Sequence, residues 1–205
     1  MIIAFINMFV FSLVMSASPG PVNMISLSIG VNCGLKRAVP FVLGATLGFT
    51  LLLLIIGLTM EFGAGELGHQ SSRFRSVLSV GGAVFMIYLG CRMFTSGSVT
   101  RASLKDVPSF YDGMVVQWLN PKAWAASMAG VGAFNVGHST AKLLQFVSIY
   151  FVVCFVAIGC WAACGEKLQS MLRRNSRLEV FNRVMGSGLI VLSLILLAQY
   201  NQGVS

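Results

Sequence analysis

The chain has 205 residues, of which 56% are hydrophobic and only 10% are charged, and its mean hydropathy is +0.83. Soluble domains carry about 25% charged residues, so this composition excludes a soluble protein and indicates a polytopic membrane protein. The net charge of +8 does not indicate a nucleic-acid partner, because the basic residues lie between apolar runs, where a bilayer surface is expected. The length predicts a single domain, 1–205, of about six membrane-spanning helices at roughly 20 residues each.

Six apolar regions follow one another along the chain, and they predict an all-α membrane bundle. They cover residues 2–35, 39–60, 76–94, 110–134, 143–165 and 184–200. The first is longer than one bilayer crossing of about 30 Å, so it must tilt, bend or include a partial segment. In the second, Gly44 and Gly48 are four residues apart, a spacing that allows close contact with another helix.

The basic residues predict the orientation of the bundle. The connections after the first, third and fifth regions hold ten Lys and Arg residues, against three in the connections after the second and fourth. Cytoplasmic loops carry an excess of Lys and Arg. We therefore expect the odd connections in the cytoplasm and both chain termini on the outer side.

The first region is interrupted by the motif Ser18-Pro19-Gly20-Pro21-Val22-Asn23-Met24. Two prolines that flank a glycine break a helix, since proline lacks an N–H and clashes with the preceding turn. A helix broken inside hydrocarbon leaves backbone groups that lipid cannot pair, and it is tolerated only where protein or a water-filled cavity meets them. The motif therefore predicts the wall of a polar pathway through the membrane.

The fourth region contains a second break, in Trp118-Leu119-Asn120-Pro121-Lys122-Ala123-Trp124. This motif places Asn120, Pro121 and Lys122 in mid-span. A lysine at the centre of a bilayer costs about 2.5–3.5 kcal/mol on insertion scales. We therefore expect Lys122 to face a cavity, a partner or a group of carbonyls.

The two breaks occupy matching places, each in the first helix of a set of three. Because three is an odd number of spans, the sets are predicted to form two inverted halves, approximately 1–95 and 108–201. Interrupted segments at matching positions of inverted halves indicate the substrate site of a secondary transporter. A broken helix is expected to present free N–H groups at one end and free carbonyls at the other, and an amino-acid zwitterion needs both.

These motifs together resemble the LysE/RhtB family of bacterial amino-acid exporters. The resemblance covers the length, the number of apolar regions, the first motif, Gly44-x-x-x-Gly48, and the run from Gly113 through Gln117 to Ala123. It implies export of amino acids or their derivatives across the inner membrane, with proton antiport as the driving force. It also implies which residues line or shape the pathway. These are Pro19, Gly20, Pro21, Asn23, Asn120, Pro121 and Lys122.

Charged and polar residues outside the motifs refine the expectation. All six acidic residues lie at span ends or in loops, so a cationic cargo finds no obvious counter-ion and a small neutral amino acid is favoured. Asp112, about two turns before the second break, is the candidate for the coupling proton. Alternatively, Asp112 lies at the N-terminus of a helix because the helix dipole favours a carboxylate there. Gln117 either faces the same cavity or bonds a neighbouring helix.

We therefore expect a transporter, not an enzyme, whose partners are an amino acid, a proton or other coupling ion, and the lipid bilayer. No cofactor or metal site is predicted, because the five cysteines lie in apolar runs without a C-x-x-C pair. Exposed small-residue faces permit a homodimer but do not require one. Two alternatives stay open, a small-solute channel and a transmembrane thiol–disulfide carrier, which needs two reactive cysteines facing each other at the breaks.

Overall fold

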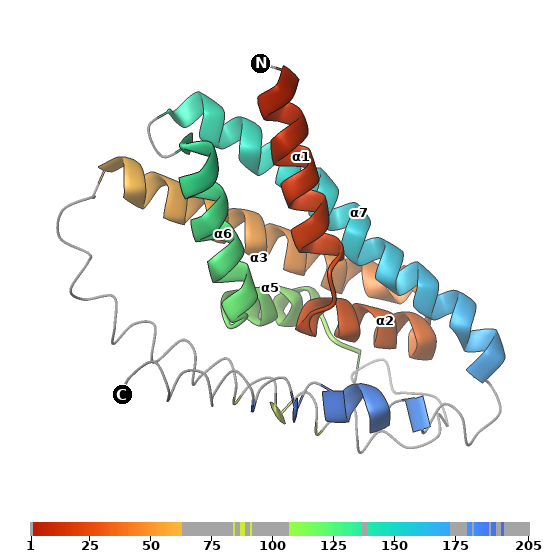
Figure 1. Ribbon diagram of the computed structural model, residues 1–205. Helices are drawn as coiled ribbons and strands as arrows, with labels where there is room; N and C mark the ends of the chain where they lie inside the picture. Colours follow the sequence, from red (N-terminus) through yellow and green to blue (C-terminus); the bar gives the residue numbers. More distant parts are fainter. Residues whose placement is uncertain are drawn as a thin grey trace.

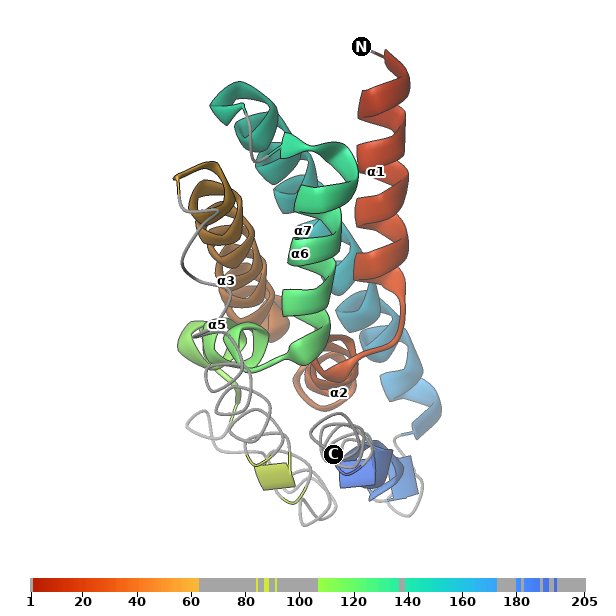
Figure 2. The same ribbon diagram turned by 60° about the vertical axis from the view of Figure 1, so that its left-hand side comes forward.

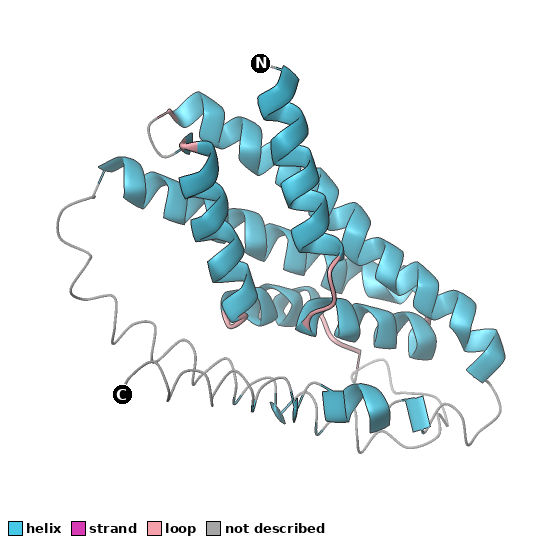
Figure 3. Ribbon diagram, in the orientation of Figure 1, coloured by secondary structure: helices cyan, strands magenta, loops and turns pink. Residues whose placement is uncertain are grey.

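The computed structural model describes residues 2–62, 107–136 and 139–172, with short pieces of the segments 84–91 and 180–194. Within these residues every regular element is a helix, which confirms the predicted all-α fold (Figure 3). The helices are α1 (Ile2–Ala17), α2 (Pro21–Cys33), α3 (Leu35–Phe62), α5 (Phe110–Trp118), α6 (Pro121–Phe134) and α7 (Thr140–Leu172).

The predicted apolar regions correspond to these helices. Region 2–35 forms α1 and α2, which are bent by 62° at the break, so the expected bend is present and the pair is either a broken span or a re-entrant segment. Regions 39–60 and 143–165 lie within α3 and α7, which are both long and apolar enough to cross a membrane. Region 110–134 divides into α5 and α6. Regions 76–94 and 184–200 lie largely outside the described residues, so the six-span count and the inverted halves stay predictions.

The helix boundaries follow from local backbone chemistry. Helices α2 and α6 begin at Pro21 and Pro121, because proline at the first position loses no intrahelical bond and has a helical φ. Helix α2 ends at Cys33, and its C-cap Gly34 has a φ of 84°, which lies in the left-handed region that favours glycine. Both breaks therefore lie where the sequence predicted them.

The two long helices, α3 and α7, pack against each other, and the broken helices pack on them (Figures 1 and 2). Helices α1 and α2 pack on α7, whereas α5 and α6 pack on α3. The N-terminal pair, α1 and α2, thus contacts the long helix of the C-terminal part, and the later pair, α5 and α6, contacts the long helix of the N-terminal part. The shared core includes Phe41 and Leu52 of α3 with Phe146 and Tyr150 of α7, all at most 1% exposed. This exchange brings the two breaks close together.

Glycines bring the backbones of these helix pairs into contact. A Cβ at Gly44 would meet the Phe110 carbonyl of α5, and a Cβ at Gly113 would meet the Phe41 carbonyl of α3. A Cβ at Gly48 would lie 3.0 Å from the Met114 Cα. The close contact predicted from Gly44-x-x-x-Gly48 is therefore confirmed. Helices α2 and α7 make the same kind of close backbone contact at Gly30 and Gly165, which was not predicted from the sequence.

Candidate functional site

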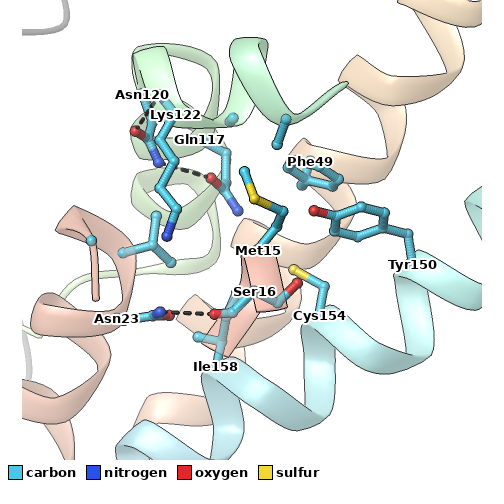
Figure 4. A pocket seen from close by; sticks show the side chains of 14 residues that line it. Met15, Ser16, Asn23, Phe49, Gln117, Asn120, Lys122, Tyr150, Cys154 and Ile158 are labelled. Atoms are coloured by element: carbon cyan, nitrogen blue, oxygen red, sulfur yellow. Dashed lines mark hydrogen bonds between the residues drawn. The ribbon is translucent and has the colours of Figure 1, made fainter. Parts of the chain in front are cut away.

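The two breaks meet at a cavity of about 40 Å³ (Figure 4). Every one of the helices α1, α2, α3, α5, α6 and α7 contributes to its wall, directly or through the break beside it. The lining residues are Met15, Ser16, Gly20, Val22, Asn23, Phe49, Gln117, Asn120, Lys122, Ala123, Ala126, Tyr150, Cys154 and Ile158.

Five of the predicted site residues line this cavity. They are Gly20, Asn23, Gln117, Asn120 and Lys122. Pro19 is exposed and Pro21 is buried at the start of α2, and neither lines the cavity. Pro121 begins α6, but its side chain lies outside the described residues. The prolines thus shape the breaks, and the polar residues next to them face the space between.

Lys122 connects the second break to the first. Its Nζ donates to the Ser18 carbonyl at 2.8 Å, to the Ser18 Oγ at 2.7 Å and to the Pro19 carbonyl at 3.4 Å. The expectation that Lys122 faces a cavity or a group of carbonyls is confirmed, since it does both. An ammonium placed in this way binds the negative end of the α1 dipole.

The carbonyls at the end of α1 are not free, which corrects the expectation from the sequence. The Asn23 Nδ2 donates to the Ser16 and Ser18 carbonyls at 2.8 Å each. The Trp161 Nε1 donates to the Ala17 carbonyl at 3.1 Å. Side chains of the protein therefore occupy the carbonyls that we expected to be open to a substrate ammonium, because a buried carbonyl without a partner is costly.

The second break is also covered by side chains. The Asn120 Oδ1 accepts the Lys122 backbone N–H at 3.1 Å and so caps α6. The Asn120 Nδ2 donates to the Gln117 Oε1 at 3.4 Å, a bond drawn as a dashed line in Figure 4. The Trp124 Nε1 donates to the Trp118 carbonyl at 2.7 Å. Gln117 thus faces the cavity, as the first of its two alternatives proposed, and its hydrogen bond is to Asn120 at the adjoining break.

Sequence reasoning missed three polar residues of the cavity wall, Ser16, Tyr150 and Cys154. Tyr150 and Cys154 lie one turn apart on α7, far from both motifs, and reach the cavity only because α7 packs across the breaks. The Tyr150 ring stacks on Phe49 at 4.3 Å and also contacts Phe146 and Phe11. The i, i+4 spacing of Tyr150 and Cys154 within an apolar helix was the only available signal.

Asp112 lies away from the cavity, at the start of α5. Its Oδ2 accepts the Ser109 N–H at 2.6 Å and the Ser109 hydroxyl at 2.8 Å, while the Ser109 Oγ caps the Asp112 N–H. This reciprocal arrangement is a capping box. Asp112 thus lies where its alternative placed it, as a carboxylate at the start of a helix. Its role in proton coupling stays a prediction.

A helical membrane bundle whose broken helices enclose a polar cavity has the architecture of a membrane transporter. The family of LysE type translocators matches residues 13–200. The chain therefore belongs to this family of membrane-embedded transporters, which confirms the resemblance seen in the motifs.

Curated relatives point in the same direction. The cysteine/O-acetylserine efflux protein of Klebsiella pneumoniae is 26% identical over 164 residues, which cover 78% of this chain and 81% of the relative. The protein of the same name from Escherichia coli K12 is 22% identical over 170 residues, covering 82% of this chain and 85% of the relative. No solved structure matches the chain.

Proposed function

We propose that this chain exports a small neutral amino acid or amino-acid derivative from the bacterial cytoplasm across the inner membrane, in exchange for protons. Membership of the LysE type translocators and the names of the relatives support an amino-acid cargo. The observation that carries the proposal is the cavity between the two breaks, whose polar wall consists of amides, hydroxyls, a thiol and one ammonium. These groups can pair both the carboxylate and the ammonium of a zwitterion.

The charge of the cavity supports a neutral cargo. Its lining includes the cation Lys122 and no carboxylate. Two acidic side chains belong to the described residues, and both are used elsewhere: Asp112 caps α5, and the Glu166 Oε1 accepts the Leu35 N–H at 3.1 Å. A lysine or arginine cargo would bring a second cation beside Lys122 without a counter-ion, which is unfavourable at low dielectric.

The Lys and Arg count supports an orientation with the odd connections in the cytoplasm and both termini in the periplasm, as a multi-pass inner-membrane protein. The direction of transport is proposed from the coupling, since protons that enter the cytoplasm down their gradient would drive the amino acid outward. In everted vesicles the lumen corresponds to the periplasm, so export appears as uptake, and respiration makes the lumen acidic.

The proposal is tested by uptake of labelled cysteine and O-acetylserine into such vesicles. We expect saturable uptake that nigericin abolishes, because this ionophore collapses the pH gradient, and no uptake of labelled arginine. Vesicles from cells without the protein are the control. Uptake of arginine would contradict the neutral cargo. Uptake that neither saturates nor depends on the gradient would identify the alternative, a channel.

We propose Asp112 as the proton carrier, since protonation would weaken the bonds that its Oδ2 accepts from Ser109 and so loosen the start of α5. Asp112→Asn keeps a capping side chain but cannot ionise. We expect this variant to transport without dependence on the pH gradient. Ser109→Ala is the matched control, because it breaks the same capping box and keeps the carboxyl group. If Asp112→Asn responds to nigericin as the wild type does, Asp112 is only a cap.

The thiol–disulfide carrier finds no support at the cavity. That chemistry requires two cysteines that face each other. Among the described cysteines, Cys154 lines the cavity, whereas Cys33, Cys91, Cys160 and Cys164 do not.

A further inference from the structure

The two breaks create four helix ends, and each has backbone groups that its own helix cannot pair. Side chains cover three of them: Asn23 and Lys122 at the end of α1, Trp124 at the end of α5, and Asn120 at the start of α6. The fourth end, the start of α2, is different. Its N-cap is Gly20, and no side chain in the described part of the chain caps it.

The open donors at this end are the backbone N–H groups of Val22 and Asn23. Pro21 has no N–H, and the next donor, Met24 N–H, already bonds the Gly20 carbonyl at 2.9 Å. Val22 and Asn23 are 5% and 4% exposed, and both line the cavity, as does Gly20. Donors at a helix start, with the positive end of the dipole, form a site for an anion.

Two further groups converge on the same wall. The Ser16 Oγ is buried in a residue that is only 9% exposed, lines the cavity and forms no hydrogen bond of good geometry within the described residues, although the Tyr150 hydroxyl and the Cys154 thiol lie beside it. A buried hydroxyl without a well-formed bond is available to donate to a ligand in the cavity. The Lys122 Nζ would lie 3.4 Å from a Cβ at Gly20, so its positive charge stands beside the start of α2.

We propose that the start of α2, with the Ser16 hydroxyl and the Lys122 ammonium, binds the α-carboxylate of the exported amino acid. This subsite rests on the proposed function and deepens it, because it assigns the carboxylate to one of the four helix ends. It also explains the glycine at position 20. Asp, Asn or Ser would cap α2 better than glycine, but such a side chain would occupy the position that the substrate carboxylate takes.

The substitution Gly20→Asp tests the subsite directly. The backbone permits it, since φ of Gly20 is −171° and an added Cβ would meet only Lys122 atoms at 3.4 and 3.5 Å. The new carboxylate would cap α2 beside Lys122 and mimic the substrate. We expect the melting temperature in detergent to rise by about 2–4 °C and export to fall by at least about tenfold.

Gly20→Ala is the matched control, because it adds the same Cβ without an acceptor. We expect no rise in its melting temperature and a smaller loss of export. Stabilisation together with loss of export separates a filled site from a misfolded protein. If Gly20→Asp melts at or below the temperature of Gly20→Ala, the start of α2 is not an anion site and the proposal is overturned.

Ligand analogues test the carboxylate separately. We expect cysteine to raise the melting temperature of the wild type, whereas cysteamine and cysteine methyl ester, which lack the free carboxylate, do not. Gly20→Asp should lose the response to cysteine. Equal stabilisation by cysteamine and cysteine would overturn the subsite. If no amino acid stabilises the wild type while Gly20→Asp is still the more stable protein, the proposed cargo fails and the anion site stands.

Discussion

Replacing Lys122 by methionine is expected to reduce export by about a hundredfold or more while the protein stays folded in the membrane. The ammonium donates to two carbonyls and one hydroxyl at the first break, and hydrogen bonds to a charged group contribute about 1.5–3 kcal/mol each. Methionine has a similar length and no donor, so the link between the two breaks is lost. The Ser18 carbonyl keeps its bond from Asn23, which limits the damage to the fold.

Export by cells that express the variant measures this prediction, and size-exclusion chromatography in detergent checks that the protein is folded. Ser18→Ala is the matched control, because it removes only the hydroxyl partner and leaves both carbonyl partners of Lys122. Asn120→Ala, which removes the cap of α6, is expected to abolish export as well. Wild-type export by Lys122→Met would contradict the assignment of the site to the two breaks.

The breaks themselves could be predicted from the sequence because their cause is local. Pro-Gly-Pro and Asn-Pro interrupt a helix through covalent geometry, whatever the rest of the chain does. The polar residues beside them, Asn23, Asn120 and Lys122, then face the cavity because lipid would not accept them. The capping box of Ser109 and Asp112 was readable in the same way, since its two members lie three residues apart.

The partners of these residues could not be predicted, because they depend on packing over long distances in the chain. Lys122 bonds a carbonyl 104 residues away, and Trp161 bonds one 144 residues away. Tyr150 and Cys154 reach the cavity only through the position of α7. For the same reason the sequence predicted free carbonyls at the first break, where the structure shows them paired.

This pairing makes the two helix ends at the first break unequal. At the end of α1 the protein's own side chains fill the acceptor positions, and Lys122 itself supplies an ammonium there. At the start of α2 no side chain of the described residues caps the helix, and Val22 and Asn23 line the cavity. In the proposed subsite, a zwitterion that enters the cavity would find donors for its carboxylate there. Its ammonium must compete with Lys122 or Asn23 for the carbonyls of Ser16 and Ser18, which gives a physical reason for substrate binding to loosen the contact between the breaks.

Gly44→Ala is expected to separate α3 from α5 and to lower the melting temperature by about 5–10 °C. The added Cβ would meet the Phe110 carbonyl oxygen, with the carbonyl carbon at 2.7 Å and the Cα at 3.0 Å, and rigid backbone cannot yield as a flexible side chain does. Overpacking of this kind costs about 1–3 kcal/mol, or about 2–4 °C per kcal/mol for a chain of this size. Because α5 leads into the second break, its displacement also moves Gln117 and Asn120, so export should fall with stability.

Gly159→Ala in α7 is the matched control for Gly44→Ala, since a Cβ at Gly159 meets nothing within 4 Å among the described residues. Alanine has the higher helix propensity, by about 0.5–1 kcal/mol, so this variant should melt at or slightly above the wild-type temperature and export normally. Thermal unfolding in detergent and vesicle uptake measure both variants side by side. The expected difference arises from backbone contact alone, because both substitutions add one methyl group to a membrane helix. Equal melting temperatures would show that α3 and α5 can move apart freely, and the rigid position of the second break would then need another cause.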